Sequence, residues 1–144
     1  MTAPDADYLR TDKNPFLLRR DLPGRVEYYD FDTPPTQRNV DLVFAVNALH
    51  CAKDYRASLS HIHEMLRSGG TLLLAEGCPW TTVEAQPWAL NILFCQFEGW
   101  WDRGGFRSRA EWISDLEEVG FRSIEWQSLQ AGEHDLGGLI WGRK

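Results

Sequence analysis

The sequence predicts an α/β domain built on a parallel sheet, and two observations support this class. Three apolar segments, residues 26–30, 40–47 and 71–76, have the composition of buried strands, and each stops at a polar residue. Between the second and third lies a segment with apolar residues at helical spacing. A strand, a helix and a strand in succession form the crossover unit that joins parallel neighbours. We therefore expect one sheet with flanking helices.

The amino-terminal part of the chain is the least regular. Residues 1–14 are polar, and we expect a disordered or frayed terminus there. Residues 15–22 suit one or two helical turns, which the following proline and glycine would end. Aromatic and β-branched residues then predict a strand over residues 25–32, followed by a proline-containing loop.

Residues 40–76 are expected to form the strand, helix and strand of one unit. The run DLVFAV is continuously apolar, as in a parallel strand that is covered on both faces. Asp54 is a suitable N-cap for the next helix, and Ser68-Gly69-Gly70 is a suitable stop. The run TLLLAE supplies the second strand. The apolar stripe of the helix consists of Tyr55, Leu59, Ile62, Met65 and Leu66.

The carboxyl-terminal half begins with an aromatic-rich segment. At about residues 78–106 the pattern predicts a helical lid or insertion over the sheet edge. Ser108, with Glu111 three residues later, is a capping-box signature that starts a helix ending at Gly120. Two further strands close the chain as a hairpin.

The composition suits a single intracellular globular domain. A chain of 144 residues is long enough for one core. Its net charge of −6 opposes binding to nucleic acid or to an anionic membrane. The three cysteines lack C-x-x-C spacing, so neither a disulfide framework nor a metal site is expected, and a reducing cytoplasm fits. No apolar run approaches the roughly 20 residues of a membrane-spanning helix.

Polar residues that follow the predicted strands would share one edge of the sheet, where open α/β sheets bind ligands. His50 has an ordinary pKa of about 6.5, and Glu76 can orient its ring, as a general base requires. The alternative is that His50 caps the next helix and that Glu76 is solvated at a strand end. The edge set consists of Asp30, Asn47, His50 and Glu76.

The other candidates also have structural alternatives. Asp30 and Asp32 point to the same side of an extended chain and can serve one ligand, or they form a solvated turn. Asn47 can hold a cofactor through its amide or bond its own turn. Phe31 can cover an adenine ring or belong to the core. The paired tryptophans of the lid can line an acyl-substrate pocket or anchor the lid to the sheet.

Five short motifs, in order along the chain, resemble those of class I S-adenosylmethionine-dependent methyltransferases. The resemblance is strongest to the type 12 carbon-methyltransferase domains of polyketide synthases, and it runs from about residue 15 to the end. The motifs are N-x-L-H, a glycine pair, a strand-closing glutamate, G-W-W, and S-x-x-x-W with a final G-F. They are carried here by Asn47, Leu49, His50, Gly69, Gly70, Glu76, Gly99, Trp100, Trp101, Ser108, Trp112, Gly120 and Phe121.

The resemblance implies a partial Rossmann-like methyltransferase sheet, strands three to seven, with flanking helices and a helical lid. It implies S-adenosylmethionine as the cofactor, with Asp30 and Phe31 at its adenine side and Asn47 as a further ligand. His50, supported by Glu76, would remove a proton from a carbon between two carbonyl-like groups. The methyl acceptor would be an acyl or β-keto small molecule of secondary metabolism, free or bound to an acyl carrier.

Two parts of the family pattern have no recognisable counterpart in this sequence. One is the glycine-rich loop that holds the methionine part of the cofactor, and the other is the acidic residue at the end of the second strand that holds the ribose. With strand order three, two, one, four, five, seven, six, loss of strands one and two leaves residues 40–46 at an edge, which invites association. Either residues 26–30 cross to pair there, or a homodimer or an amino-terminal partner chain covers the edge. The alternative to an enzyme is therefore a truncated, non-catalytic module that binds a partner chain.

Overall fold

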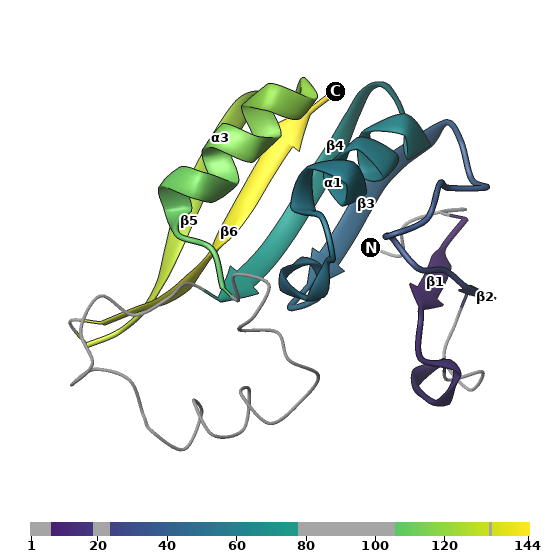
Figure 1. Ribbon diagram of the computed structural model, residues 1–144, viewed down its shortest axis with the longest axis horizontal. Coiled ribbons are helices and arrows are strands. Elements are labelled where there is room, and N and C mark those ends of the chain that lie inside the picture. Colours follow the sequence, from purple (N-terminus) through teal and green to yellow (C-terminus); the bar gives the residue numbers. More distant parts are fainter. Residues whose placement is uncertain (1–6, 19–23, 78–105, 133) are drawn as a thin grey trace, which may run out of the picture.

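The computed structural model describes residues 7–18, 24–77, 106–132 and 134–144 of the chain (Figure 1). Within these ranges the chain forms a four-stranded sheet, a two-stranded sheet and two α-helices. The predicted α/β class, with a sheet and flanking helices, is confirmed.

The four-stranded sheet has the order β3-β4-β6-β5. Its first two strands, β3 (Val40–Val46) and β4 (Leu66–Gly77), are parallel. Strand β6 (His134–Arg143) pairs antiparallel with both β4 and β5 (Arg122–Ala131). The expected strand–helix–strand unit and the closing hairpin are therefore both confirmed. The arrowheads of β3 and β4 lie on the same side in Figure 1, so their carboxyl ends share one edge.

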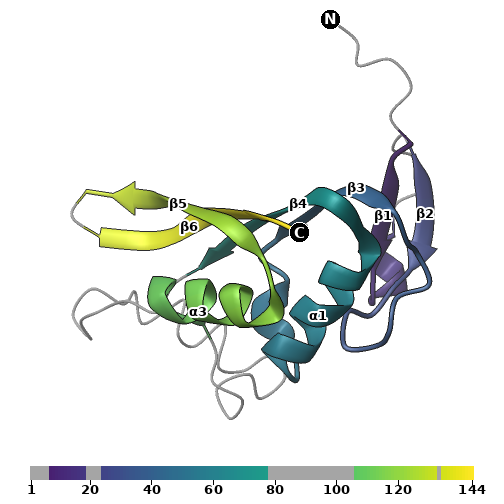
Figure 2. The same ribbon diagram turned by 90° about the horizontal axis from the view of Figure 1, so that it is seen from above.

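Both α-helices cover the same face of this sheet (Figure 2). Helix α1 (Tyr55–Met65) connects β3 to β4, and the predicted N-cap Asp54 accepts the N–H of Ala57 at 3.0 Å. Helix α3 (Arg109–Val119) precedes β5 and begins with the predicted capping box. The core between helices and sheet consists of Leu49, Leu59, Ile62, Leu66, Leu72, Leu74, Trp112, Leu116, Phe121 and Ile140.

No described helix lies over the opposite face of the sheet (Figure 2), and this face is largely apolar across β3, β4 and β6. Strand β3 is at the edge, and its alternate residues Leu42, Phe44 and Val46 are 52%, 54% and 55% exposed. The strand register places Phe44 beside Leu73, which is opposite Trp141, so an apolar row crosses three strands. Parallel sheets are normally covered on both faces. The described part of the chain leaves this face open.

The smaller sheet pairs β1 (Leu9–Asp12) with β2 (Arg25–Tyr28) in parallel, and a short 3-10 turn, η1 (Pro15–Leu17), follows β1. The expectation of a frayed or disordered segment was wrong for residues 9–12, which form β1. The amide of Arg25 adds a bond to the Tyr8 carbonyl at 2.8 Å. Strand β2 does not cross to pair with β3, because β1 is its partner.

The predicted boundary between α1 and β4 differs from the observed one. The helix ends at Met65 and the strand begins at Leu66, so Ser68-Gly69-Gly70 lies inside the strand and is not the helix stop. Leu66 pairs with Val40, and this contact with the sheet draws the chain into an extended conformation immediately after the helix.

Residues 78–105 of the predicted lid, including Trp100 and Trp101, lie outside the described residues. Of the helices that the structure does describe, none combines the length and the apolar character needed to cross a bilayer.

Candidate functional site

The chain turns sharply where β3 ends. Asn47 has a φ of 48°, a left-handed conformation that asparagine tolerates better than most residues. Its N–H donates to the Ala75 carbonyl at 2.7 Å, which extends the pairing of β3 with β4 by one residue. A short 3-10 turn, η2 (Leu49–Cys51), then buries Leu49 and His50. The turn therefore delivers the His50 ring to the interior beside the end of β4.

Glu76 of β4 meets this turn with both carboxylate oxygens. Oε1 accepts the backbone N–H groups of Ala48 at 2.9 Å and of Leu49 at 2.7 Å. Oε2 lies 2.9 Å from Nδ1 of His50, and a carboxylate can only accept, so the ring nitrogen donates. Glu76 is 2% exposed and His50 is 4% exposed. Three hydrogen bonds thus satisfy a buried carboxylate whose burial would otherwise be costly.

The protonation of His50 follows from this environment. Burial lowers its pKa, but hydrogen bonds and electrostatic interactions with Cys51 and Glu76 raise the pKa to about 9. The ring is therefore protonated on both nitrogens at neutral pH. Because Nδ1–H is held by Glu76, Nε2 is the nitrogen that exchanges a proton. A buried imidazole and carboxylate in this arrangement can perform general acid–base chemistry.

The acidic turn after β2 contains two aspartates with different contacts. Oδ1 of Asp30 accepts the N–H of Asp32 at 3.1 Å, which is a local turn of the Asx type. Oδ1 of Asp32 accepts the N–H of Lys53 at 2.9 Å and the hydroxyl of Ser58 at 3.1 Å. Asp32 therefore fastens the turn to the start of α1, which is a structural role.

Phe31, between these aspartates, is partly buried against the core. Its carbonyl accepts a bond from Nδ1 of His61 at 2.9 Å, and the ammonium of Lys13 lies 5.7 Å from its ring centroid. One face of the Phe31 ring is thus close to a cation at the carboxyl end of β1.

Sequence reasoning missed Asp12, the last residue of β1. It is paired with Tyr28 across the parallel ladder, at the same edge as the turn that contains Asp30. Its Oδ1 accepts the N–H of Asn14 at 2.7 Å. The available signal was a strand-ending Asp before an Asn-Pro turn, but the segment LRTD has a single strongly apolar residue and was not assigned as a strand.

The structure brings together some predicted site residues and separates others. His50 and Glu76 are in direct contact, and Asn47 belongs to the same turn with an exposed side chain. Asp30 and Phe31 lie at the end of the smaller sheet. The predicted substrate residues Trp100 and Trp101 lie outside the ranges that the structure describes.

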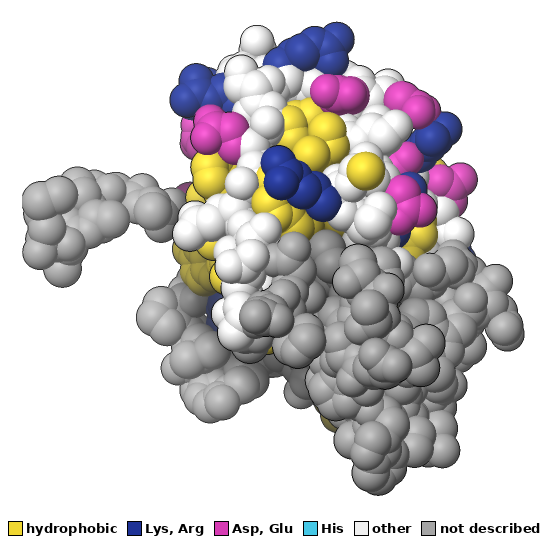
Figure 3. All heavy atoms as spheres, turned by 90° about the vertical axis from the view of Figure 1, so that its left-hand side faces the viewer, with side chains coloured by type: hydrophobic (Ala, Val, Ile, Leu, Met, Phe, Trp, Pro, Cys, Tyr) yellow, Lys and Arg dark blue, Asp and Glu magenta, His cyan; other side chains and the backbone are white. Residues whose placement is uncertain are grey.

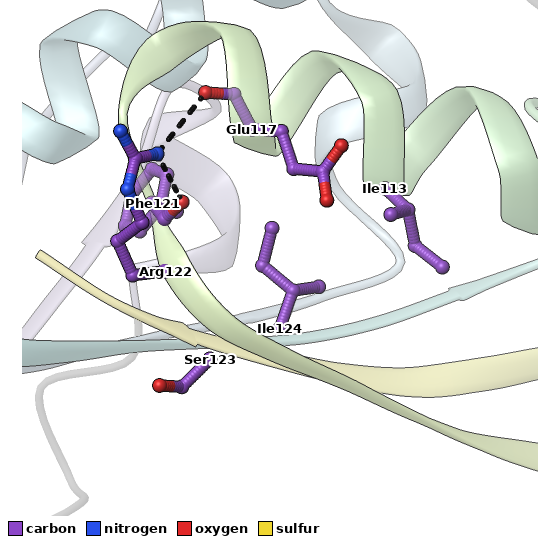
Figure 4. A pocket seen from close by; sticks show the side chains of 6 residues that line it. All are labelled: Ile113, Glu117, Phe121, Arg122, Ser123 and Ile124. Atoms are coloured by element: carbon purple, nitrogen blue, oxygen red, sulfur yellow. Dashed lines mark hydrogen bonds between the residues drawn. The ribbon is translucent and has the colours of Figure 1, made fainter.

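A pocket of about 340 Å³ lies elsewhere, between α3 and β5 (Figure 4). Nη1 of Arg122 donates at its rim to the carbonyls of Phe121, at 2.9 Å, and Glu117, at 3.5 Å. Figure 3, which faces this end of the molecule, shows acidic and basic side chains intermixed around hydrophobic ones. The pocket contains no residue of the carboxyl edge. It is lined by Ile113, Glu117, Phe121, Arg122, Ser123 and Ile124.

Comparison with known sequences finds one matching family model and several similar proteins. Residues 17–74 match the model of the family described as methyltransferase domain. The chain is 34% identical over 109 residues to the iterative polyketide synthase afoE of Emericella nidulans, a match that covers 71% of this chain. It is 28% identical over 124 residues, or 81% of this chain, to a 3-methylorcinaldehyde synthase of a Phoma species. The matched region spans only 4% of each synthase.

Solved structures show the same fold. The carbon-methyltransferase domain of the citrinin polyketide synthase matches with a TM-score of 0.80 and 24% identity, over 94% of this chain and 38% of that one. The trans-methyltransferase CalH, solved in complex with SAH, matches with a TM-score of 0.79 and 18% identity. That match covers 95% of this chain and 42% of CalH. The four-stranded sheet with its helices is therefore a methyltransferase fold.

Proposed function

Since the chain has a methyltransferase fold and matches the methyltransferase domain family over residues 17–74, we propose that it transfers a methyl group from S-adenosylmethionine to a carbon acid. The acceptor is an acyl or β-keto small molecule, free or on an acyl carrier, as in secondary metabolism. The observation that carries this proposal is the buried hydrogen bond, 2.9 Å long, between His50 and Glu76 at the carboxyl edge.

In this mechanism Nε2 of His50 takes the proton from the acceptor carbon. Glu76 fixes the ring through Nδ1, and its negative charge stabilises the imidazolium that forms. With a pKa of about 9, only about one ring in a hundred is in the basic form at pH 7. Transfer should therefore become faster as the pH rises towards 9. Trp100 and Trp101 are our candidates for the lining of the acyl pocket.

The described residues fit the nucleoside end of the cofactor. S-adenosylmethionine, when bound, supplies the methyl group on a sulfonium. Asp12 ends the strand next to β2 and would accept hydrogen bonds from the ribose hydroxyls, which is the role of the acidic residue in the family pattern. The adenine side of the cofactor would be held by Asp30 and Phe31, and Asn47, in the turn after β3, would be a further ligand. Within the described ranges no glycine-rich loop joins an early strand to a helix, so the methionine end needs residues from outside them.

Isothermal titration with S-adenosylmethionine and S-adenosylhomocysteine tests the cofactor site. We expect micromolar binding that Asp12→Asn and Asp30→Ala each weaken by about tenfold, the effect of one charge-assisted hydrogen bond. Asp41→Asn is the matched control, because Asp41 is exposed on β3 and pairs with Arg67. His50→Gln should bind the cofactor normally but lose methyl transfer to a β-keto thioester and its rise with pH. Absence of binding by the unchanged chain would exclude a stand-alone enzyme.

The open face of the sheet favours a second candidate function, a non-catalytic module that binds a partner chain. Phe44 and Val46 stay more than half exposed on an edge strand, which in a parallel sheet is normally covered. We expect the chain to self-associate or to bind an amino-terminal methyltransferase segment through this face. Sedimentation should show larger species that Phe44→Lys dissociates, whereas Phe16→Lys, on an exposed residue outside the sheet, should not. If the unchanged chain and both variants are monomers, this role is contradicted.

A further inference from the structure

His50 is held on a second side, away from Glu76. The hydroxyl of Tyr55, the first residue of α1, donates to the His50 carbonyl at 3.1 Å. The ring of Phe106 lies over the imidazole, with centroids 4.9 Å apart and planes tilted by 44°. The ring nitrogen and the backbone carbonyl of His50 are thus fixed by different elements, β4 and α1.

Tyr55 is itself held by residues at the start of α3. The guanidinium of Arg107 lies over its ring, 4.7 Å from the centroid, a typical cation–π distance. Trp112 meets the same ring edge-on, with centroids 5.6 Å apart and planes at 86°. These two contacts leave the phenol little freedom to turn away from the His50 carbonyl.

Arg107 is anchored in turn by a buried carboxylate. Its Nη2 lies 2.5 Å from Oδ2 of Asp115, a residue of α3 that is 2% exposed. The other oxygen of Asp115 accepts from Nε of Arg56 at 2.9 Å. Arg107 is 20% exposed, whereas Arg56 is 58% exposed, so the two arginines share one carboxylate but only Arg107 is largely enclosed.

We propose that Tyr55 and Arg107 are positioning residues for His50, with Asp115 as their anchor on α3. The contacts form one path, from the buried carboxylate through the guanidinium and the phenol to the backbone of the dyad histidine. Glu76 alone fixes one ring nitrogen, and the ring can still pivot about that bond. The tie to the carbonyl restrains the backbone from which the ring projects and so limits its movement, which matters because proton abstraction requires Nε2 at a set distance from the carbon. The proposal rests on the proposed role of His50 as the base.

The test is a double-mutant cycle in which the measured quantity is the exchange rate of the Nδ1–H proton of His50. This rate is obtained from NMR spectra of the full chain. Tyr55→Phe and Arg107→Met should each speed exchange by about five- to tenfold, the factor of one hydrogen bond. Because both act along one path, the double variant should exchange no faster than either single variant. Arg56→Met is the matched control, since it removes an ion pair to the same Asp115 without touching Tyr55, and it should change the rate less than about twofold.

A second readout is the pKa of Tyr55. Burial raises this pKa and the charge of Arg107 lowers it, so Arg107→Met should raise it further while Arg56→Met leaves it unchanged. Equal effects of Arg107→Met and Arg56→Met, or additive effects in the cycle, would overturn the proposal. Tyr55→Phe, which removes a single hydroxyl, keeps the test valid if Arg107→Met fails to fold. Neither readout needs methyl transfer, so an inactive chain that shows the non-additive cycle would refute the proposed function alone.

Discussion

Replacing Glu76 by glutamine removes the charge of the dyad but can keep the bonds to the turn that follows β3. In the unchanged chain, Oε1 of Glu76 accepts the N–H groups of Ala48 and Leu49 at 2.9 and 2.7 Å. The amide oxygen of glutamine can still accept both. The amide nitrogen then faces Nδ1 of His50, so the variant loses both the negative charge and the acceptor for the Nδ1–H group. Because both side chains are almost fully buried, solvent screens this charge very little.

The magnitude follows from the pKa of His50, which is about 9 in the folded chain against an ordinary 6.5. A pKa that is raised on folding stabilises the fold fully below pH 6.5, and this stabilisation is lost as the pH rises through 9. At about 1.4 kcal/mol for each pH unit, the interval corresponds to about 3 kcal/mol. Cys51 and Glu76 both raise the pKa of His50 against the effect of burial, each through a hydrogen bond and an electrostatic interaction. Part of this stabilisation should therefore disappear in Glu76→Gln, while Cys51 continues to raise the pKa of His50.

Urea unfolding between pH 6 and 10 measures this difference directly. The free energy of unfolding of the unchanged chain should fall by about 3 kcal/mol across this range because of His50, and that of Glu76→Gln should fall by less. Glu64→Gln, at a half-exposed glutamate on α1, is the matched control and should keep the full pH dependence. If Glu76→Gln keeps it too, the charge of Glu76 does not set the protonation of His50, and the dyad as described here is wrong.

Two further predictions concern the elements that carry the site. Asp54→Ala removes the N-cap of α1, whose carboxylate accepts the Ala57 N–H at 3.0 Å, and should cost about 1 kcal/mol in urea unfolding at pH 7; an unchanged midpoint would contradict the cap. Gly137→Ala would place a Cβ atom 2.2 Å from the Glu76 carbonyl oxygen, so the pairing of β4 with β6 must shift, and we expect a loss of at least about 3 kcal/mol by thermal unfolding. Gly132→Ala, in the hairpin turn with φ of +62° and open space around it, should lose only about 1 kcal/mol, and equal losses would refute the steric argument.

Local signals were sufficient for most elements of the main sheet. The run of apolar residues in β3, the helical spacing after Asp54 and the Ser108–Glu111 capping box each involve neighbours in the sequence, and each was predicted correctly. The contact between His50 and Glu76 could be predicted because the carboxyl ends of parallel neighbours meet. For these residues, the topology follows from one strand–helix–strand unit.

The failures have a common physical cause, because they involve pairings between distant segments. Residues 9–12 form a strand only through their ladder with residues 25–28, and their own composition gives almost no strand signal. The turn signal at Gly69 was overridden because Leu66 pairs with Val40 in the sheet. The network of Tyr55, Arg107 and Asp115 likewise joins two helices that are separated by more than forty residues of sequence.

The residues of the proposed site are divided between the two sheets. This division would couple cofactor binding to the binding of any chain that covers β3. On the proposed function, Asp12 and Asp30 hold the nucleoside from the smaller sheet, while His50 and Glu76 act from the larger one. The described strands of the two sheets are not hydrogen-bonded to each other, and the edge of β3 is open. A chain that covers β3 would therefore also fix the spacing of the two halves of the site. Binding free energies are reciprocal, so the factor by which this cover tightens cofactor binding is the factor by which the cofactor tightens association. Phe44→Lys should then weaken association, and it should weaken cofactor binding by no more than this coupling factor.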